Sequence, residues 1–275
     1  LRRQGRWQEA IDALQRAVSM EPENHDSILD LASTFSRVRR YDEAIKSCRK
    51  AIELVPDDIY PYVFLARSLT LKGEIEEARG ILEAMPNRDP AQQGFYRYEQ
   101  AKFERDFAGA MSALSMVDDE IVDPIWEIDF TRPLAECECG IFGALGGATS
   151  QTCLRALAAL VRDSEIEPGD PAVHAALGWA YALTGDKEHA IQAGRRAVEL
   201  TPVTADAMSG HTYLVMLAKI YAWVDEPYLA VKTIHTAMTT PGWISVATLE
   251  NDPGWDPIRD DPRFQELLKM YGDAE

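Results

Sequence analysis

A 34-residue period constrains this chain more than any other feature of its sequence. Residues of the same kind return in register in the N-terminal part, at Trp7, Tyr41 and Ile75, at Ala10, Ala44 and Ala78, and at Pro22 and Pro56. The same frame returns later at Leu177, Gly178, Tyr181, Gly185, Ala190, Ala197 and Pro202. A repeat of this length is a single supersecondary unit that cannot bury its apolar face alone, so neighbouring units must stack against one another.

The residue types in the repeat predict two antiparallel helices per unit. Helices approach closely only where small residues lie at the crossing, as at Ala32, Ala44, Ala66, Ala78, Gly178 and Ala190. The turn within a unit is expected at Gly5, Arg39, Gly73 and Gly185, and the second helix is expected to end before Pro22, Pro56 and Pro202. The pattern therefore predicts an all-α solenoid in which stability is shared along the array.

These residues and spacings resemble the tetratricopeptide repeat. The resemblance implies a right-handed superhelix of helix hairpins, with a protein or peptide as its partner. Residues 177–210 and 241–268 further resemble the C-terminal repeat modules of bacterial transcriptional regulators, adenylate cyclases and serine/threonine kinases, which often follow a TolB-like region. That second resemblance implies a sensory or scaffolding module of a larger signalling protein, and it carries over no catalytic residue.

The frame divides the chain into four parts. Residues 1–118 form an N-terminal subarray with a truncated first unit, and residues 119–150 form an irregular acidic and glycine-rich connection with the start of a degenerate unit. Residues 151–240 form a C-terminal subarray. Its last unit lies 40 rather than 34 residues on, which predicts a lengthened first helix starting near Ala205. Residues 241–275 are expected to cap that unit through a terminal helix and Trp243, Leu249, Trp255, Phe264 and Leu268.

Composition excludes some classes of function. The formal net charge of -17 argues against nucleic-acid binding, which requires clustered Lys and Arg. No apolar run approaches the roughly 20 residues of a membrane span. The chain starts at Leu1 without the pattern of a signal peptide, so we expect it to continue upstream. The compartment stays open, either cytoplasmic or, behind a membrane anchor, periplasmic.

The first helices of such an array line a concave groove, which is the candidate binding site. The frame places nine residues near this face: Tyr60, Phe64, Arg67, Phe95, Glu99, Phe103, Trp179, Lys219 and Trp223. Aromatic side chains over a groove suit a peptide ligand, because they bury a large area at a modest entropic cost. The alternative is that several of them pack against adjacent helices.

No pattern of catalytic, metal-binding or cofactor-binding residues is evident, so we expect no enzyme, no metal and no cofactor. Cys137, Cys139 and Cys153 could supply three thiolates to a metal, but small buried cysteines fit a close helix pair better. The sequence favours a non-catalytic interaction or scaffolding module whose partner is another protein, a peptide or an upstream domain of the same chain. A regulatory domain that closes on a small molecule is the alternative.

Overall fold

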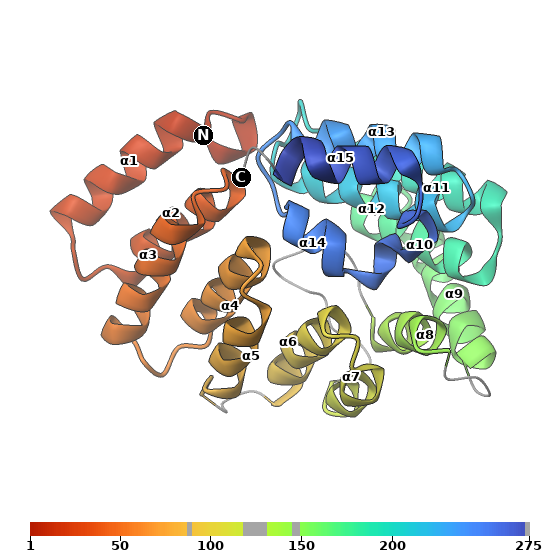
Figure 1. The fold of residues 1–275 in the computed structure, drawn as a ribbon, viewed down its shortest axis with the longest axis horizontal. Coiled ribbons are helices and arrows are strands. Elements are labelled where there is room, and N and C mark those ends of the chain that lie inside the picture. Colours follow the sequence, from red (N-terminus) through yellow and green to blue (C-terminus); the bar gives the residue numbers. More distant parts are fainter. Residues whose placement is uncertain (87–89, 118–130, 145–148, 273–275) are drawn as a thin grey trace.

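The computed structural model describes residues 1–86, 90–117, 131–144 and 149–272 (Figure 1). Every regular element in these ranges is a helix, so the predicted all-α solenoid is confirmed. In chain order the elements are η1 (Arg2–Gln4), α1 (Trp7–Met20), α2 (His25–Arg37), α3 (Tyr41–Leu54), α4 (Tyr60–Lys72), α5 (Ile75–Glu83), α6 (Pro90–Phe103), α7 (Phe107–Leu114), α8 (Arg132–Phe142), α9 (Thr149–Ile166), α10 (Pro171–Thr184), α11 (Lys187–Leu200), α12 (Ser209–Trp223), α13 (Pro227–Met238), α14 (Val246–Asn251), η2 (Pro253–Ile258) and α15 (Pro262–Gly272).

The predicted turns lie where the sequence placed them. Gly5, Gly73 and Gly185 have φ values of 70°, 94° and 85°, and Arg39 has 62° at the corresponding point of its own unit. Glycine adopts this left-handed conformation without strain, whereas arginine does so at some cost. Among the second helices, α1 ends at Met20, α3 at Leu54 and α11 at Leu200, each shortly before the proline of its repeat.

One core runs through both predicted subarrays. A single cluster of buried side chains includes Ala32 of α2, Leu114 of α7, Leu134 of α8, Leu160 of α9 and Ile220 of α12. The crossing positions are filled as predicted, since Ala32, Ala44, Ala78 and Ala190 are each fully buried. The predicted connection falls largely on residues 118–130 and 145–148, which lie outside the described residues. The described helices on either side of it share the same core.

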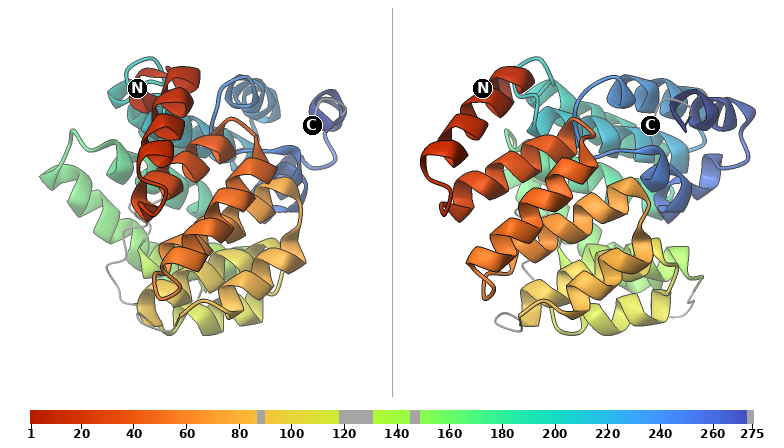
Figure 2. Two further views of the ribbon diagram at one scale, coloured as in Figure 1. Left: turned by 90° about the vertical axis from the view of Figure 1, so that its left-hand side faces the viewer. Right: turned by 60° about the vertical axis from the view of Figure 1, so that its left-hand side comes forward.

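The prediction for the last unit is wrong. Helix α12 starts at Ser209 and has 15 residues, one more than α10, so the additional residues do not lengthen it. They form a turn in which Asp206 accepts hydrogen bonds from the backbone N–H groups of Met208 and Ser209, at 2.9 and 3.2 Å. The same carboxylate pairs with Arg3, and the N–H of Ala207 donates to the carbonyl of Arg3 at 2.8 Å. This turn therefore holds the start of the chain against the last repeat (Figure 2).

The C-terminal part only partly caps the final unit. Helix α15 lies beside α13, and Leu249, Trp255, Phe264 and Leu268 join the apolar cluster of α12 and α13 as predicted. Residues 241–258, here called the crossing segment, take a different course. They carry α14 through the middle of the curved array, where it contacts α4, and then bring η2 against α12 (Figure 1). The prediction that Trp243 covers the last repeat is wrong, because it packs with Tyr41 and Leu71 of the N-terminal repeats.

Candidate functional site

The nine predicted groove residues lie on four first helices. Tyr60, Phe64 and Arg67 are on α4, Phe95, Glu99 and Phe103 on α6, Trp179 on α10, and Lys219 and Trp223 on α12. Tyr60 is 40% exposed, and most of the others are partly buried. Phe95 at 4% and Trp179 at 0% are inside the core, so neither presents a surface to a partner in this conformation.

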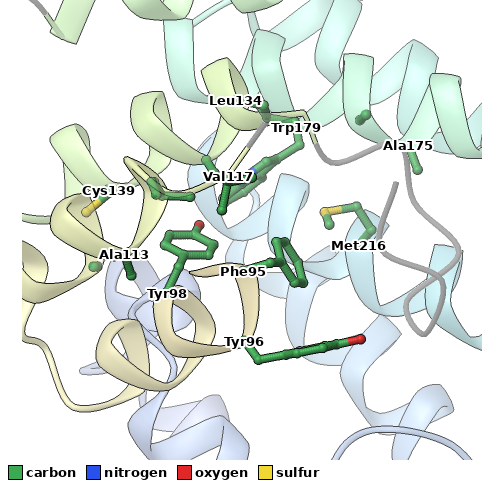
Figure 3. Close-up of a cluster of buried hydrophobic side chains, with 14 of the residues drawn as sticks. Phe95, Tyr96, Tyr98, Ala113, Val117, Leu134, Cys139, Ala175, Trp179 and Met216 are labelled. Atoms are coloured by element: carbon green, nitrogen blue, oxygen red, sulfur yellow. The ribbon is translucent and has the colours of Figure 1, made fainter. Parts of the chain in front are cut away.

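Trp179 is at the centre of an aromatic cluster. Its ring lies 6.4 Å from the Phe142 ring of α8 and 5.8 Å from the Trp223 ring of α12, centroid to centroid. Phe107 of α7 extends the cluster beyond Phe142. Figure 3 shows Trp179 directed inward among buried side chains that include Leu134 and Met216. Trp179 therefore packs between adjacent helices, which is the alternative to groove contact.

Trp243 of the crossing segment lies against the predicted groove residues of α4. The guanidinium carbon of Arg67 is 5.0 Å from the centre of the indole ring, and that of Arg37 in α2 is 4.5 Å from it. The Phe64 ring lies 6.5 Å away. A cation within about 6 Å of an indole face is attracted by the ring quadrupole, and more strongly when water is excluded. Trp243 is only 3% exposed, so both arginines meet it in a largely dry site.

The other end of the crossing segment contacts the groove residues of α12. The Lys219 ammonium is 2.6 Å from the Asp252 carboxylate, and both side chains are mostly buried. The indole N–H of Trp223 donates to the carbonyl of Gly254 at 2.9 Å. Lys219 also lies 5.7 Å from the centre of the Trp255 ring. Burial raises the pKa of Asp252, but Lys219 and Lys102 outweigh it and leave the pKa below its usual value.

A buried ionic cluster lies between α6 and α8. Lys102 contacts Glu99 at 2.7 Å and Glu138 at 3.4 Å, and Glu138 accepts a hydrogen bond from the Tyr98 hydroxyl. Burial would lower the pKa of Lys102, but the two carboxylates keep it raised. Burial raises the pKa of Glu138 despite Lys102. Each charge in this cluster must be desolvated, which offsets much of the attraction between the ammonium and the two carboxylates.

A pocket remains open beside the crossing segment. It is lined by Arg67, Glu99 and Phe103 from the predicted groove, by apolar residues of α4 and α6, and by Thr248 of α14. Its volume of about 60 Å³ is well below the several hundred Å³ typical of cofactor sites. It suits one branched side chain or a very small ligand.

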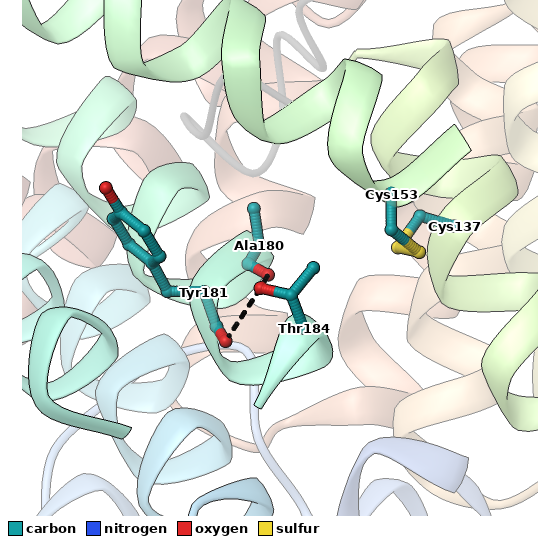
Figure 4. Close-up of a disulfide and its surroundings, with 5 residues drawn as sticks. All are labelled: Cys137, Cys153, Ala180, Tyr181 and Thr184. Atoms are coloured by element: carbon teal, nitrogen blue, oxygen red, sulfur yellow. Dashed lines mark hydrogen bonds between the residues drawn. A yellow bond between two sulfur atoms is a disulfide. The ribbon is translucent and has the colours of Figure 1, made fainter. Parts of the chain in front are cut away.

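Two of the candidate metal-binding cysteines form a disulfide instead. Cys137 of α8 is bonded to Cys153 of α9 (Figure 4), and Cys139 is buried with its Sγ 3.4 Å from the carbonyl oxygen of Phe107. No group of three or more His, Cys, Asp or Glu suited to a metal occurs in the described ranges. Burial raises the pKa of the Cys139 thiol to about 11, which keeps it protonated at neutral pH. No feature of the sequence distinguishes this bonded pair from two small packing residues.

Two family models, each described as a tetratricopeptide repeat, match the sequence. One covers residues 37–96 and the other covers residues 1–59 and 153–203. Together they account for more than half of the chain. The chain belongs to the tetratricopeptide repeat family. Proteins of this family bind other proteins or peptides and are generally non-catalytic, and the fold supports an interaction or scaffolding module.

Solved tetratricopeptide repeat structures share the fold at low identity. A tetratricopeptide repeat protein from Parabacteroides merdae has 15% identity and a TM-score of 0.53, with 98% of this chain and 93% of that one covered. Cut9–Hcn1, from an APC/C hetero-tetramer, has 17% identity and a TM-score of 0.52. That match covers 98% of this chain and 47% of the other, so this chain spans about half its length. At such identities the likeness concerns the fold alone.

Within the described ranges, no helix combines the length and the apolar character that crossing a bilayer needs.

Proposed function

We propose that this chain is a non-catalytic protein-interaction or scaffolding module that binds a peptide or partner segment on its concave face. In this proposal it is the C-terminal part of a larger bacterial signalling or regulatory protein, as the resemblance of residues 177–210 and 241–268 implies. One observation carries the binding role. Phe64, Arg67, Lys219 and Trp223, chosen from the repeat frame alone, all contact the crossing segment of the same chain.

The accessible part of this face is the strip along α4 and α6. Tyr60, Phe64 and Arg67 are spaced by four and three residues, so they share one face of α4. Arg67 also lines the pocket with Glu99 and Phe103. Tyrosine and arginine, here the exposed Tyr60 and the pocket-lining Arg67, are among the residue types that contribute most to protein interfaces. We therefore place the first contact of a partner on this strip.

A pair of tyrosines offers a matched test. Tyr60→Ala removes a side chain that is 40% exposed on the strip, and Tyr228→Ala removes one that is 60% exposed at the start of α13. Tagged chains are used to capture proteins from the source cells, and the captured proteins are quantified by mass spectrometry. A partner bound by the wild type and by Tyr228→Ala is expected to fall about tenfold with Tyr60→Ala. Equal capture by all three chains would overturn the assignment.

The second candidate is a regulatory domain that senses a small molecule or peptide, and the pocket beside α14 favours it. A ligand that fills this pocket would link α4 and α6 to the crossing segment. Binding to the folded chain alone raises its melting temperature. Thermal-shift measurements across small-metabolite and peptide panels test this candidate, and a panel without a shift would remove it.

A further inference from the structure

The occupied concave face indicates the chemistry of the partner. We propose that this face recognises an acidic segment with spaced tryptophans and short helical turns, and that the crossing segment is a built-in ligand which an external partner of the same chemistry displaces. This inference rests on the proposed function, because it concerns the same face. It names the class of partner and adds a competition that regulates binding.

The crossing segment covers the last repeat and also continues across the concave face, as a bound peptide would. At its start, the N–H of Gly242 donates to the carbonyl of Arg37 at 2.8 Å. At its end, Arg105 in the turn between α6 and α7 binds Asp256 through two hydrogen bonds of 2.6 and 2.8 Å. In a stacked array an end cap needs to contact only the last repeat. This segment covers the last repeat through Leu249 and Trp255, and it also contacts Arg105 and Arg37, which lie 151 residues or more upstream of their partners Asp256 and Gly242.

The contacts fall into two anchors that recognise different groups. The first anchor is Trp243, whose ring is contacted by the guanidinium groups of Arg37 and Arg67. The second is the pair Asp252 and Trp255, which both meet Lys219. Asp252 also accepts the N–H of Gly254 at 2.8 Å, so the Asp-Pro-Gly-Trp turn presents its carboxylate and its indole together. An aromatic ring alone, or a carboxylate alone, would satisfy only part of this face.

Charge complementarity supports an acidic partner in particular. The chain has 28 Lys and Arg against 45 Asp and Glu. Four of those scarce cations, Arg37, Arg67, Arg105 and Lys219, nevertheless meet the crossing segment from the array side. The segment contacts these cations with the carboxylates of Asp252 and Asp256 and with two indole rings. A neutral or basic peptide would leave Lys219 partly buried without its carboxylate, which is costly.

The crossing segment and an external segment compete for the same concave face. The crossing segment is tethered directly behind α13, so it competes at a high effective concentration. The apparent affinity for an external peptide is the intrinsic affinity reduced by the fraction of chains whose face is vacant. Weakening the tethered segment without altering the array must therefore strengthen the binding of a peptide in trans.

The test uses the whole chain and a labelled synthetic peptide of residues 241–258. Fluorescence anisotropy measures peptide binding to the wild type and to the chain with Trp243→Leu, which keeps an apolar side chain but removes the ring. We expect binding to the variant to be at least about tenfold tighter than to the wild type. A peptide with Asp252→Asn and Trp255→Ala is expected to lose binding, and it cannot affect the folding of the chain. If circular dichroism shows that the Trp243→Leu chain is unfolded, the chain with Asp252→Asn takes its place.

Three results would overturn the inference. The first is a peptide that binds the variant no better than the wild type. The second is equal binding of the doubly substituted peptide. The third is a variant that forms dimers by exchanging its own segments, as light scattering would reveal, because the occupant would then be a second copy. None of these results alters the capture that depends on Tyr60, so failure here is distinguishable from failure of the proposed function.

Discussion

The pair formed by Lys219 and Asp252 gives the sharpest prediction for stability. Asp252→Asn removes the negative charge and keeps an oxygen that can accept the N–H of Gly254, now 2.8 Å from the carboxylate. The change therefore isolates the charge from the cap of η2. Lys219→Met removes the ammonium and keeps an unbranched apolar stem. A double variant carries both substitutions.

The expected magnitude follows from burial. The side chains of Lys219 and Asp252 are 15% and 7% exposed, and their charged atoms are 2.6 Å apart. Removing one partner of a buried pair leaves an uncompensated charge and costs about 3–5 kcal/mol. Because Lys219 is partly exposed, we expect each single variant to lose about 3 kcal/mol of unfolding free energy, at the lower end of that range. The double variant leaves neither charge alone, so we expect a coupling energy of about 2 kcal/mol.

Urea unfolding of the four chains measures this cycle through the midpoint and the slope. The control is Glu77→Gln, which breaks the exposed pair of Arg49 and Glu77 and should cost less than about 1 kcal/mol. Additive single variants, with a coupling below about 0.5 kcal/mol, would refute the reasoning. A cost of Asp252→Asn no larger than that of the exposed control would do the same, because the buried pair would then contribute nothing.

Four further predictions concern other contacts. A Cβ on Gly242 would lie 2.2 Å from the buried His211 ring, so Gly242→Ala should destabilise by about 1–3 kcal/mol in urea unfolding. Gly80→Ala, which meets nothing within 4 Å in helix α5, should stabilise by about 0.5–1 kcal/mol. Burial lowers the pKa of His211 to about 4 from 6.5, so the unfolded chain binds more protons between these values. Unfolding free energy should therefore fall as the pH drops from 6.5 to 4, and His211→Asn should flatten that profile. Reducing the bond between Cys137 and Cys153, 16 residues apart, should cost about 3 kcal/mol of unfolding free energy and lower the urea midpoint. An unchanged midpoint would contradict the expectation that this bond stabilises the chain by closing a loop.

Local geometry made much of the repeat predictable. Each unit reuses the same turn, so a residue with a left-handed backbone recurs at the same place, and even Arg39 follows the rule set by Gly73. The small residues at the crossings are predictable for a similar reason. A larger side chain at Ala44 or Ala190, both fully buried, would push neighbouring helices apart.

The course of the crossing segment was not predictable, because the repeat pattern records only contacts between neighbours. The position of Trp243 in the sequence predicts that it covers the last repeat, but it contacts Arg37 and Arg67, which lie far upstream. The extra residues before α12 were ambiguous in the same way. Six extra residues can either lengthen a helix or form a turn. The contact between Asp206 and Arg3, which the repeat pattern does not record, favours the turn.

The closed arrangement changes what binding at the concave face would do. In an open array each repeat contacts its neighbours alone, and a ligand in the groove would leave the ends independent. Here the crossing segment bonds to α2 through Gly242 and to α12 through Asp252, so it occupies the face and joins the two halves at once. A partner that displaces it must also release that join. Binding and opening of the array are then one equilibrium, and any substitution that favours opening raises the apparent affinity for the partner.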